Sequence, residues 1–364
     1  MRRGGKTDMS RRRYGVNQAY HGRRKGSGAL KVLVALLAIL LVAGVLFLLF
    51  VPKEYTDNGV RLRFPWSAEE EPKPSDPVDP SALIVAESPS PSPTPEPLTV
   101  SAALEVPADA VTNGTATELA SQAGADTLVI RVKDKEGNLA WQSDQELVQD
   151  SMNGDAAFGQ AVSQLAQDGQ LRLVARVSAF QDLWTSVYNR SLAVTTGAGE
   201  LWYDSNGISW LSVAQQEARD YLSALCLELA ELGFDEILLE HAGFPDQGRV
   251  ATIGAGDNYP SQGREDAVAA FLRELSQTLE QAGCSLSVLA ADEELTGETS
   301  GSGVSAKALA GISGRVWTAG EAGADALASA LAGAGMERAG ERLVLTGELP
   351  GDIAWTGSTA VLLD

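Results

Sequence analysis

The segment ARDYLSALCLELAELGFDEILLEH, residues 218–241, carries the repeating unit of the fold. Its first part, within a predicted helix at 213–233, places apolar residues three or four positions apart, which is the spacing of one helix face. Gly233 is a candidate C-cap. The run Glu-Ile-Leu-Leu-Glu-His that follows is short and apolar, as a strand buried on both faces should be. A helix that leads directly into such a strand predicts a parallel sheet covered by helices.

The same alternation continues from residue 98 to residue 364. Strands are predicted at 98–104, 127–133, 171–178, 236–241, 285–290, 314–318, 342–347 and 360–363. Helices are predicted at 114–124, 155–168, 213–233, 264–283, 304–311 and 321–335. Eight strands in a region of this length predict an α/β fold of the TIM (β/α)8 barrel type. A doubly wound open sheet is the alternative, because periodicity alone does not show whether the sheet closes.

Residues 29–51 are predicted to form one transmembrane helix. From Val32 to Val51 the chain runs for twenty residues without a charge, and at about 1.5 Å per residue this matches the roughly 30 Å hydrocarbon core of a bilayer. The run is longer than the roughly 7–15 apolar residues of a signal peptide and ends without small residues, which favours an uncleaved anchor.

The flanking segments predict the orientation of this helix. Residues 1–28 are basic and poor in aliphatic residues, which predicts a disordered tail, and positive charge indicates the cytoplasmic side. Residues 52–97 are rich in Pro, Ser and Glu and predict an extended stalk. The domain at 98–364 is therefore expected outside the plasma membrane. Although the tail is basic, the chain carries a net charge of −20, which argues against nucleic acid as a partner.

The few cysteine and histidine residues limit the possible cofactors. Cys226 and Cys284 are the only cysteines, and buried free thiols are favoured over one bridge. His21 and His241 are the only histidines, so a histidine-based metal site is not expected. No nucleotide-binding glycine loop occurs in a suitable context. We therefore expect neither a metal nor an organic cofactor.

Residues that end the predicted strands are candidates for the functional site, because a barrel places its site at the C-terminal ends of its strands. This rule selects Lys133, Asp134, Arg176, Glu240, His241, residues 292–294, Trp317 and Glu348. Asp134 also suits an ordinary polar turn. Arg176 lies in an apolar strand and requires an anionic partner, either a ligand or a carboxylate. Glu240 could act as a general acid or form a structural ion pair with Arg176.

Residues 180–210 concentrate aromatic side chains whose flat faces suit sugar rings, although such clusters also serve in packing. They are Phe180, Trp184, Tyr188, Trp202, Tyr203 and Trp210. Of these, Trp184, Trp202 and Trp210 are candidate substrate-binding residues. The segment 244–262 is predicted to form a rim over the same face.

Four motifs in this order resemble a family of bacterial TIM-barrel proteins classed as glycoside hydrolase-like, whose members often follow an N-terminal membrane anchor. The motifs are Val-Ile-Arg-Val-Lys-Asp-Lys-Glu-Gly (129–137), Leu-Val-Ala-Arg-Val-Ser-Ala-Phe-Gln-Asp (173–182), Leu-Trp-Tyr-Asp-Ser-Asn-Gly-Ile-Ser-Trp-Leu (201–211) and Glu-Leu-Gly-Phe-Asp-Glu-Ile-Leu-Leu-Glu-His-Ala-Gly-Phe-Pro (231–245). The resemblance covers roughly residues 98–320. It implies a barrel that cleaves or binds glycan.

The chain departs from the family pattern at several site positions. Arg131 stands where the family has the first Asp of Ile-Asp-Val-Lys-Asp. In place of Phe-Asp-Tyr-x-Arg-Phe-Pro, residues 239–245 keep an acid as Glu240 but lose the Tyr and the Arg. Leu289 lies where the next strand of the family ends in Asp, and residues 316–319 replace its Ser-Pro-Met-x-Tyr segment. These departures indicate a degenerate site.

Two functions are consistent with this sequence. The first is a cell-surface glycosidase that pairs Glu240 with Asp292 or Glu348, with the two carboxyl groups about 5–5.5 Å apart if retaining and about 6.5–9.5 Å apart if inverting. The second is a catalytically inactive barrel that binds a cell-wall glycan or a protein. Whether a second acid reaches Glu240 discriminates between them, and Leu289 favours the inactive barrel.

Overall fold

The computed structural model describes residues 53–56, 59–62, 101–297, 301–347 and 356–363, and the chain divides into two units, Met1–Ser92 and Pro93–Asp364. In the first unit, strands β1 (Lys53–Thr56) and β2 (Gly59–Leu62) form an antiparallel pair within the predicted stalk. The predicted tail, the predicted transmembrane helix and the rest of the stalk lie outside the described residues. Within the described ranges, no helix is both long and apolar enough to cross a bilayer.

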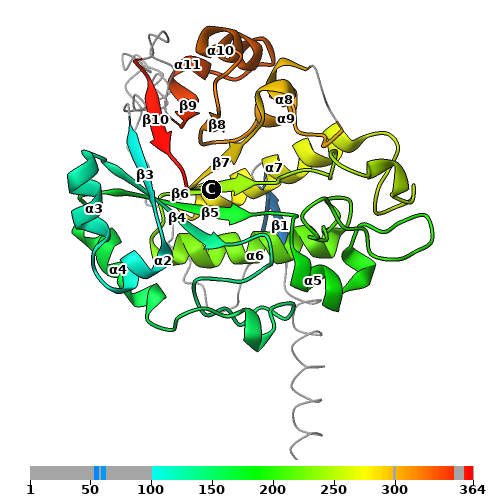
Figure 1. Cartoon of the computed structure of the whole chain (residues 1–364), viewed down its shortest axis with the longest axis horizontal. Coiled ribbons are helices and arrows are strands. Elements are labelled where there is room, and N and C mark those ends of the chain that lie inside the picture. The colour runs from blue at the N-terminus through cyan, green and yellow to red at the C-terminus, as the bar shows by residue number, and fades with distance from the viewer. Residues whose placement is uncertain (1–52, 57–58, 63–100, 298–300, 348–355, 364) are drawn as a thin grey trace, which may run out of the picture. The chain divides into compact units, whose positions relative to one another are not determined.

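The second unit contains a closed barrel of eight parallel strands (Figure 1). In barrel order the strands are β10 (Ser358–Val361), β3 (Ala102–Val106), β4 (Thr127–Lys133), β5 (Arg172–Ser178), β6 (Glu236–Glu240), β7 (Ser285–Leu289), β8 (Val316–Thr318) and β9 (Leu343–Thr346). Pairing of β10 with both β3 and β9 closes the sheet. The barrel prediction is confirmed and the open doubly wound sheet is excluded. All eight predicted strands are present, with ends shifted by a few residues.

Helices follow the strands around the barrel. Those predicted from the sequence are α3 (Ala116–Ala123), α4 (Phe158–Asp168), α6 (Gln216–Leu232), α7 (Arg264–Gln281), α9 (Ala306–Leu309) and α10 (Ala324–Gly333). Those not predicted are α2 (Ala108–Thr112), α5 (Leu183–Tyr188), α8 (Asp292–Thr296) and α11 (Ala339–Arg342), together with the 3-10 turns η1 (Asp150–Met152), η2 (Arg190–Leu192) and η3 (Val250–Thr252). Each missed element has six residues or fewer, too short for a helical period to be recognised.

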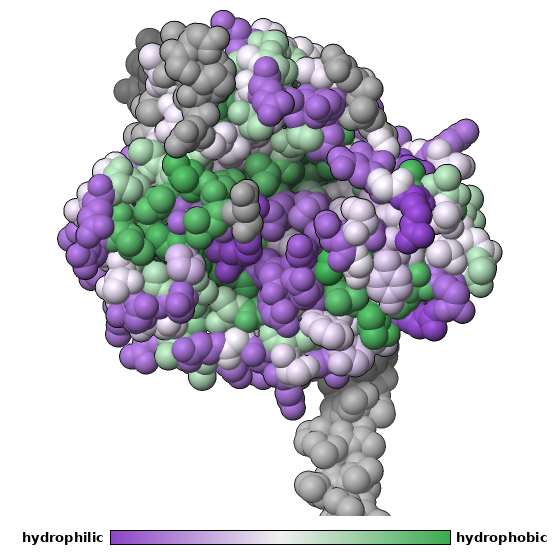
Figure 2. Space-filling model, viewed as in Figure 1, coloured by the Kyte–Doolittle hydropathy of each residue, from purple (hydrophilic) through white to green (hydrophobic). Residues whose placement is uncertain are grey.

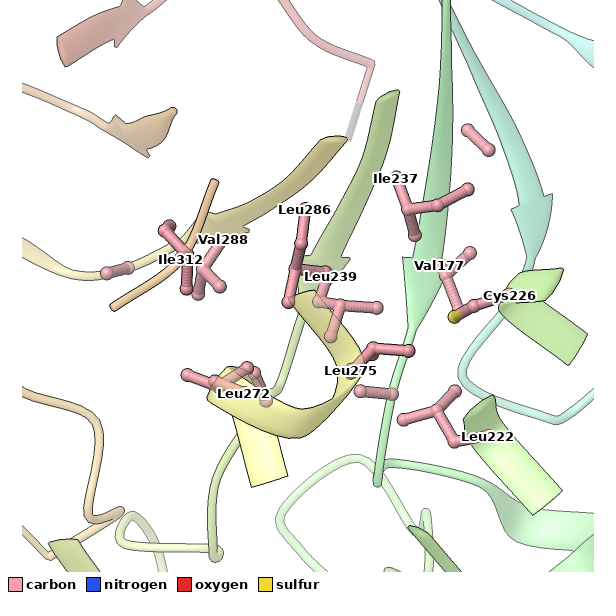
Figure 3. Close-up of a cluster of buried hydrophobic side chains, with 14 of the residues drawn as sticks. Val177, Leu222, Cys226, Ile237, Leu239, Leu272, Leu275, Leu286, Val288 and Ile312 are labelled. Atoms are coloured by element: carbon pink, nitrogen blue, oxygen red, sulfur yellow. The ribbon is translucent and has the colours of Figure 1, made fainter. Parts of the chain in front are cut away.

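The core has one layer outside the barrel wall and one inside it. Outside, Ile237 and Leu239 of β6 belong to one buried apolar cluster with Leu222 of α6 and Leu275 of α7 (Figure 3). Inside, the cluster consists of Ala103, Val129, Val174, Leu238, Trp317, Val344 and Ala360, one residue from each of seven strands. Cys226 and Cys284 are buried free thiols, which confirms the prediction that they form no bridge.

Strand alternation also stacks charged side chains inside the barrel, because every second residue of a strand points to the same side. On β6, Glu236, Leu238 and Glu240 follow one another at this spacing. Glu236 pairs with Arg172 of β5 at 2.9 Å. Two residues further along, Leu238 of β6 and Val174 of β5 belong to the apolar inner cluster. Glu240 then pairs with Arg176 of β5 at 2.6 Å. The apolar inner layer thus lies between two layers of ion pairs, and the second layer adjoins the C-terminal ends of the strands.

Candidate functional site

A cavity of about 700 Å³ opens at the C-terminal ends of strands β6 to β9. Its walls come from the ends of these strands, the loop at 202–210, the loop at 242–247 and the start of α8. The prediction that the 244–262 segment forms part of the rim is confirmed at residues 244–247. On the face shown in Figure 2, hydrophilic residues gather near the centre of the barrel.

Six of the residues predicted from the sequence line this cavity: Glu240, His241, Glu293, Glu294, Trp202 and Trp210. The two tryptophans offer little ring surface, because their exposed fractions are 2% and 9%. The indole of Trp202 donates to the backbone carbonyl of Arg249 at 3.2 Å. Packing, one of the two roles that the sequence left open for the aromatic cluster, therefore describes both indoles, and the cavity wall also carries carboxylates, amides and hydroxyl groups.

Glu240 is held by a buried network of ion pairs. Its Oε2 accepts two hydrogen bonds from the guanidinium of Arg176, at 2.6 and 3.0 Å. Arg176 also donates to Glu105 of β3 at 2.6 Å and to the backbone carbonyl of Leu363 at 3.0 Å. These two carboxylates raise the pKa of Arg176 against the opposing effect of its burial, which is the largest single influence. The ion pair foreseen between Glu240 and Arg176 is confirmed, and Arg176 is not part of the cavity wall.

Asp292, predicted as the partner of Glu240, does not line the cavity. It is buried at the start of α8, where its carboxylate accepts hydrogen bonds from the last residue of β8 and from the loop after it. The donors are the Thr318 hydroxyl, the amide of Gly320 at 3.1 Å and the amide of Ala322 at 2.7 Å. The hydrogen bonds of Asp292 therefore connect the start of α8 to the segment around the end of β8. Glu348, the other predicted partner, lies outside the described residues.

Lys133 and Asp134 form contacts within the protein and do not line the cavity. Lys133 is fully buried, with its Nζ 2.8 Å from Asp182 Oδ2 and donating to the Ser178 carbonyl at 2.7 Å. Asp134 accepts from the amide of Asn138 at 2.8 Å, and the amide of Gly137 donates to the Asp134 carbonyl at 3.1 Å. Asp134 thus forms the ordinary polar turn that was one of its two interpretations.

Trp317 and Trp184 also lie away from the cavity. Trp317 belongs to the inner core, and its indole donates to Glu236 at 3.1 Å. Trp184 is 38% exposed and stacks on Tyr188 of the same short helix, with ring centroids 6.5 Å apart. Neither tryptophan lines this cavity. The strand-end rule and the aromatic count selected them without regard to the direction of the side chain.

Four further carboxylates line the cavity: Asp204, Asp246, Glu293 and Glu294. Asp204 is the most constrained, since Oδ1 accepts from the amides of Asn206 and Ile208 at 2.8 and 3.0 Å. Its Oδ2 accepts from the side chains of Gln181 at 2.5 Å and Trp210 at 3.1 Å. These bonds outweigh the effect of burial and lower the pKa of Asp204, so this carboxylate is ionised. Asp204 lies in the motif at 201–211, which contributed to the family resemblance, but the sequence analysis assigned Asp204 no role.

Asp246 and Glu294 have the opposite electrostatic character. Burial raises the pKa of Asp246, and burial together with the charges of Asp246 and Glu293 raises the pKa of Glu294. Both carboxylate oxygens of Glu294 accept hydrogen bonds, one from the Ser302 hydroxyl and one from the amide of Ala291 at 2.9 Å. The strand-end rule selected 292–294 as a group, and the turn of α8 decides that Glu293 and Glu294, rather than Asp292, reach the cavity. Asp246 follows Phe244-Pro245 in a loop, where no periodicity marks it.

The described residues thus form a closed parallel barrel with five carboxylates around a cavity at the C-terminal ends of its strands. The chain belongs to the family described as "Putative glycosyl hydrolase domain", whose model matches residues 105–295. No curated protein matches the chain in sequence.

Several solved structures are similar to the chain at low sequence identity, and one glycoside hydrolase domain among them shares its fold. The PgaB (BpsB) glycoside hydrolase domain from Bordetella bronchiseptica is 12% identical, covers 72% of this chain and 94% of its own, and has a TM-score of 0.52. A hypothetical protein from Ruminiclostridium thermocellum is 21% identical, over 51% of this chain and 96% of its own, with a TM-score of 0.44. A Group II chitinase catalytic domain from Ostrinia furnacalis, solved with a chito-oligosaccharide, is 12% identical over 68% and 63%, with a TM-score of 0.41.

Proposed function

We propose that the chain hydrolyses a glycan in this cavity, with Glu240 as the ionised carboxylate and Asp246 as the general acid. Glycosidases use one protonated and one ionised carboxyl group on either side of the scissile bond. Two carboxyl groups whose surroundings favour opposite charge states indicate such a pair. The observation that carries the proposal is that Glu240, paired with Arg176, and Asp246, whose pKa is raised by burial, line the same cavity.

The roles follow from these surroundings. Asp246 donates its proton to the leaving-group oxygen as the glycosidic C–O bond breaks. Glu240 stabilises the positive charge that develops at the anomeric carbon, and water supplies the oxygen of the new hydroxyl. Glu294 is the less suitable acid, because Ser302 and the Ala291 amide already donate to both of its oxygens. Asp246 thus stands where the sequence analysis placed Asp292 or Glu348 as the partner of Glu240, and the general acid is Asp246 rather than Glu240.

Substitution of either carboxylate tests the proposal. The full chain is incubated with peptidoglycan, chito-oligosaccharides and plant polysaccharides, and new reducing ends are measured. We expect Glu240→Gln and Asp246→Asn to lower kcat on the hydrolysed glycan by at least about 100-fold, because each removes one half of the acid and carboxylate pair. Asp220→Asn, which changes an exposed acid on α6, should leave kcat unchanged.

A catalytically inactive barrel that binds glycan is the second candidate. It is favoured by the ion-pair network, because Arg176 already neutralises Glu240 and also holds Glu105. No turnover from a folded wild-type chain, with glycan binding retained in all variants, would support this candidate and contradict hydrolysis. If the wild-type chain neither bound nor cleaved any glycan of the panel, both candidates would be wrong.

We also propose that residues 29–51 anchor the barrel at the outer face of the plasma membrane, with the cell wall as the source of its glycan. The support is the uncharged run Val32 to Val51 and the basic residues before it. Protease added to intact cells is expected to digest the barrel and to leave an N-terminal fragment in the membrane fraction. A barrel that is digested only after the cells are lysed would contradict this orientation.

A further inference from the structure

His241 is held in an unusual backbone conformation at the edge of the cavity. It is one of two non-glycine residues with positive φ in the described part of the chain, at 53°. Hydrogen bonds to the neighbouring strand hold it there, since the amide of Ala179 donates to the Glu240 carbonyl at 2.9 Å and the amide of Phe180 to the His241 carbonyl at 3.2 Å. A residue with a Cβ adopts this conformation only where the surroundings impose it, and such residues cluster at functional sites.

The hydrogen bonds of Ser178 determine which nitrogen of the His241 ring carries the proton. Ser178 is fully buried, and its hydroxyl donates to the backbone carbonyl of Gln181 at 2.9 Å. A serine hydroxyl has one hydrogen, and a carbonyl can only accept. His241 Nδ1 lies 3.3 Å from the same Ser178 oxygen, so Nδ1 must be the donor in this contact. The neutral ring therefore carries its proton on Nδ1 and leaves Nε2 as a bare acceptor.

The surroundings of His241 favour this neutral ring. His241 is exposed to the cavity by its surface area, but protein atoms surround much of the ring, and this partial loss of water lowers its pKa. The charged groups around it oppose one another: Glu240 and Asp204 raise the pKa, whereas Arg176 and Lys133 lower it. Trp210 meets the ring edge to face, with centroids 5.5 Å apart. The imidazole is thus neutral at pH 7 and restrained in its orientation.

The same wall of the cavity holds a second acceptor. Gln181 is 4% exposed, and its Nε2 donates to Asp204 Oδ2 at 2.5 Å. Its Oε1 is buried and has no hydrogen-bond partner among the described residues. The described residues that line the cavity include no Lys or Arg that could donate to it. The oxygen is closed to solvent in this conformation, so the acceptor that a ligand in the cavity can reach is the exposed ring of His241.

We propose that Nε2 of His241 accepts a hydrogen bond from a hydroxyl group of the bound glycan, next to Glu240, and that Ser178 positions the ring for this contact. The inference rests on the proposed function, because it specifies how the same cavity holds its sugar. His241 is then a substrate-binding residue, and Ser178 is a positioning residue that acts through it.

The protonation of the ring can be tested without any glycan. The full chain labelled with ¹⁵N-histidine contains only His21 and His241, and a His241→Gln variant assigns the signals. We expect a non-protonated Nε2 and a protonated Nδ1 for His241 at pH 7, with titration below the ordinary pKa of about 6.5. Ser178→Ala should convert this single tautomer to a mixture. A proton on Nε2 in the wild-type chain would overturn the inference, whether or not any glycan binds.

The sugar contact is tested by calorimetric titration with a chito-oligosaccharide, a cello-oligosaccharide and a soluble peptidoglycan glycan strand. For a probe that binds, we expect His241→Ala to weaken the affinity about tenfold, as loss of one hydrogen bond does. His241→Gln should recover part of this loss, because its amide oxygen can accept. Unchanged affinity in His241→Ala would overturn the contact. If no probe bound the wild-type chain, the proposed function and this contact would fail together, while the tautomer would still be read from the spectrum.

Discussion

Replacement of Arg176 by Met is expected to lower the free energy of unfolding by about 3–5 kcal/mol, because it leaves two buried carboxylates without their cation. The side chains of Arg176 and Glu105 are only 10% and 1% exposed, and that of Glu240 is 11% exposed. Arg131 lies 3.4 Å from Glu105 and compensates part of the loss there. Among the residues that the structure describes, Glu240 pairs with no other cation, so the cost arises mainly at the candidate site.

Chemical denaturation of the full chain, followed by tryptophan fluorescence, measures this effect. Arg190→Met is the matched control: it removes the same kind of side chain from an ion pair with Glu200 that is 53% and 76% exposed, and little change is expected. The triple variant Arg176→Met, Glu105→Gln, Glu240→Gln should recover much of the loss, because it leaves no unpaired charge. If Arg176→Met were as stable as the control, the network would not carry the energetic role assigned to it.

Replacement of Lys133 by Met is the second large effect, again about 3–5 kcal/mol of lost stability. Lys133 and Asp182 both have fully buried side chains, and their charges are 2.8 Å apart. Asp182 Oδ1 also accepts from the amide of Thr185 at 2.9 Å as the N-cap of α5, so its charge stays in place when the lysine is removed. Lys133 donates to the Ser178 carbonyl as well. The variant is therefore also expected to loosen Ser178 and the His241 ring that it positions.

Thermal and chemical unfolding of the full chain measure the loss. Lys307→Met is the matched control, because Lys307 pairs with Glu265 at an exposed position, where solvent screens the charges, and no measurable change is expected. Lys133→Met combined with Asp182→Asn should be more stable than Lys133→Met alone, since no buried charge is left. If the single and double variants lost the same free energy of unfolding, the contribution of Lys133 to stability would come from packing rather than from its charge.

The ion pair between Glu240 and Arg176 is one feature of the site that could be predicted from the sequence. A charge in an apolar strand requires a partner, and two neighbouring strands supplied two opposite charges, so the pair could be foreseen. Asp292 shows where that reasoning failed. The sequence placed Asp292 near the cavity because it follows a strand. In the structure, the first turn of α8 directs Asp292 to Thr318 at the end of β8, whereas Glu293 and Glu294 line the cavity.

The sequence alone determined the alternation of eight strands with helices, and with it the α/β class, because strands buried on both faces and amphipathic helices leave regular apolar patterns that depend only on neighbouring residues. Only the tertiary structure decided the closure of the sheet and the lining of the cavity. Both depend on contacts between residues far apart in the chain, such as β10 with β3, or Asp246 and Glu240 around one cavity. The direction of each side chain at a strand end is likewise determined by the loop that follows it, and loops carry no periodicity from which that direction could be predicted.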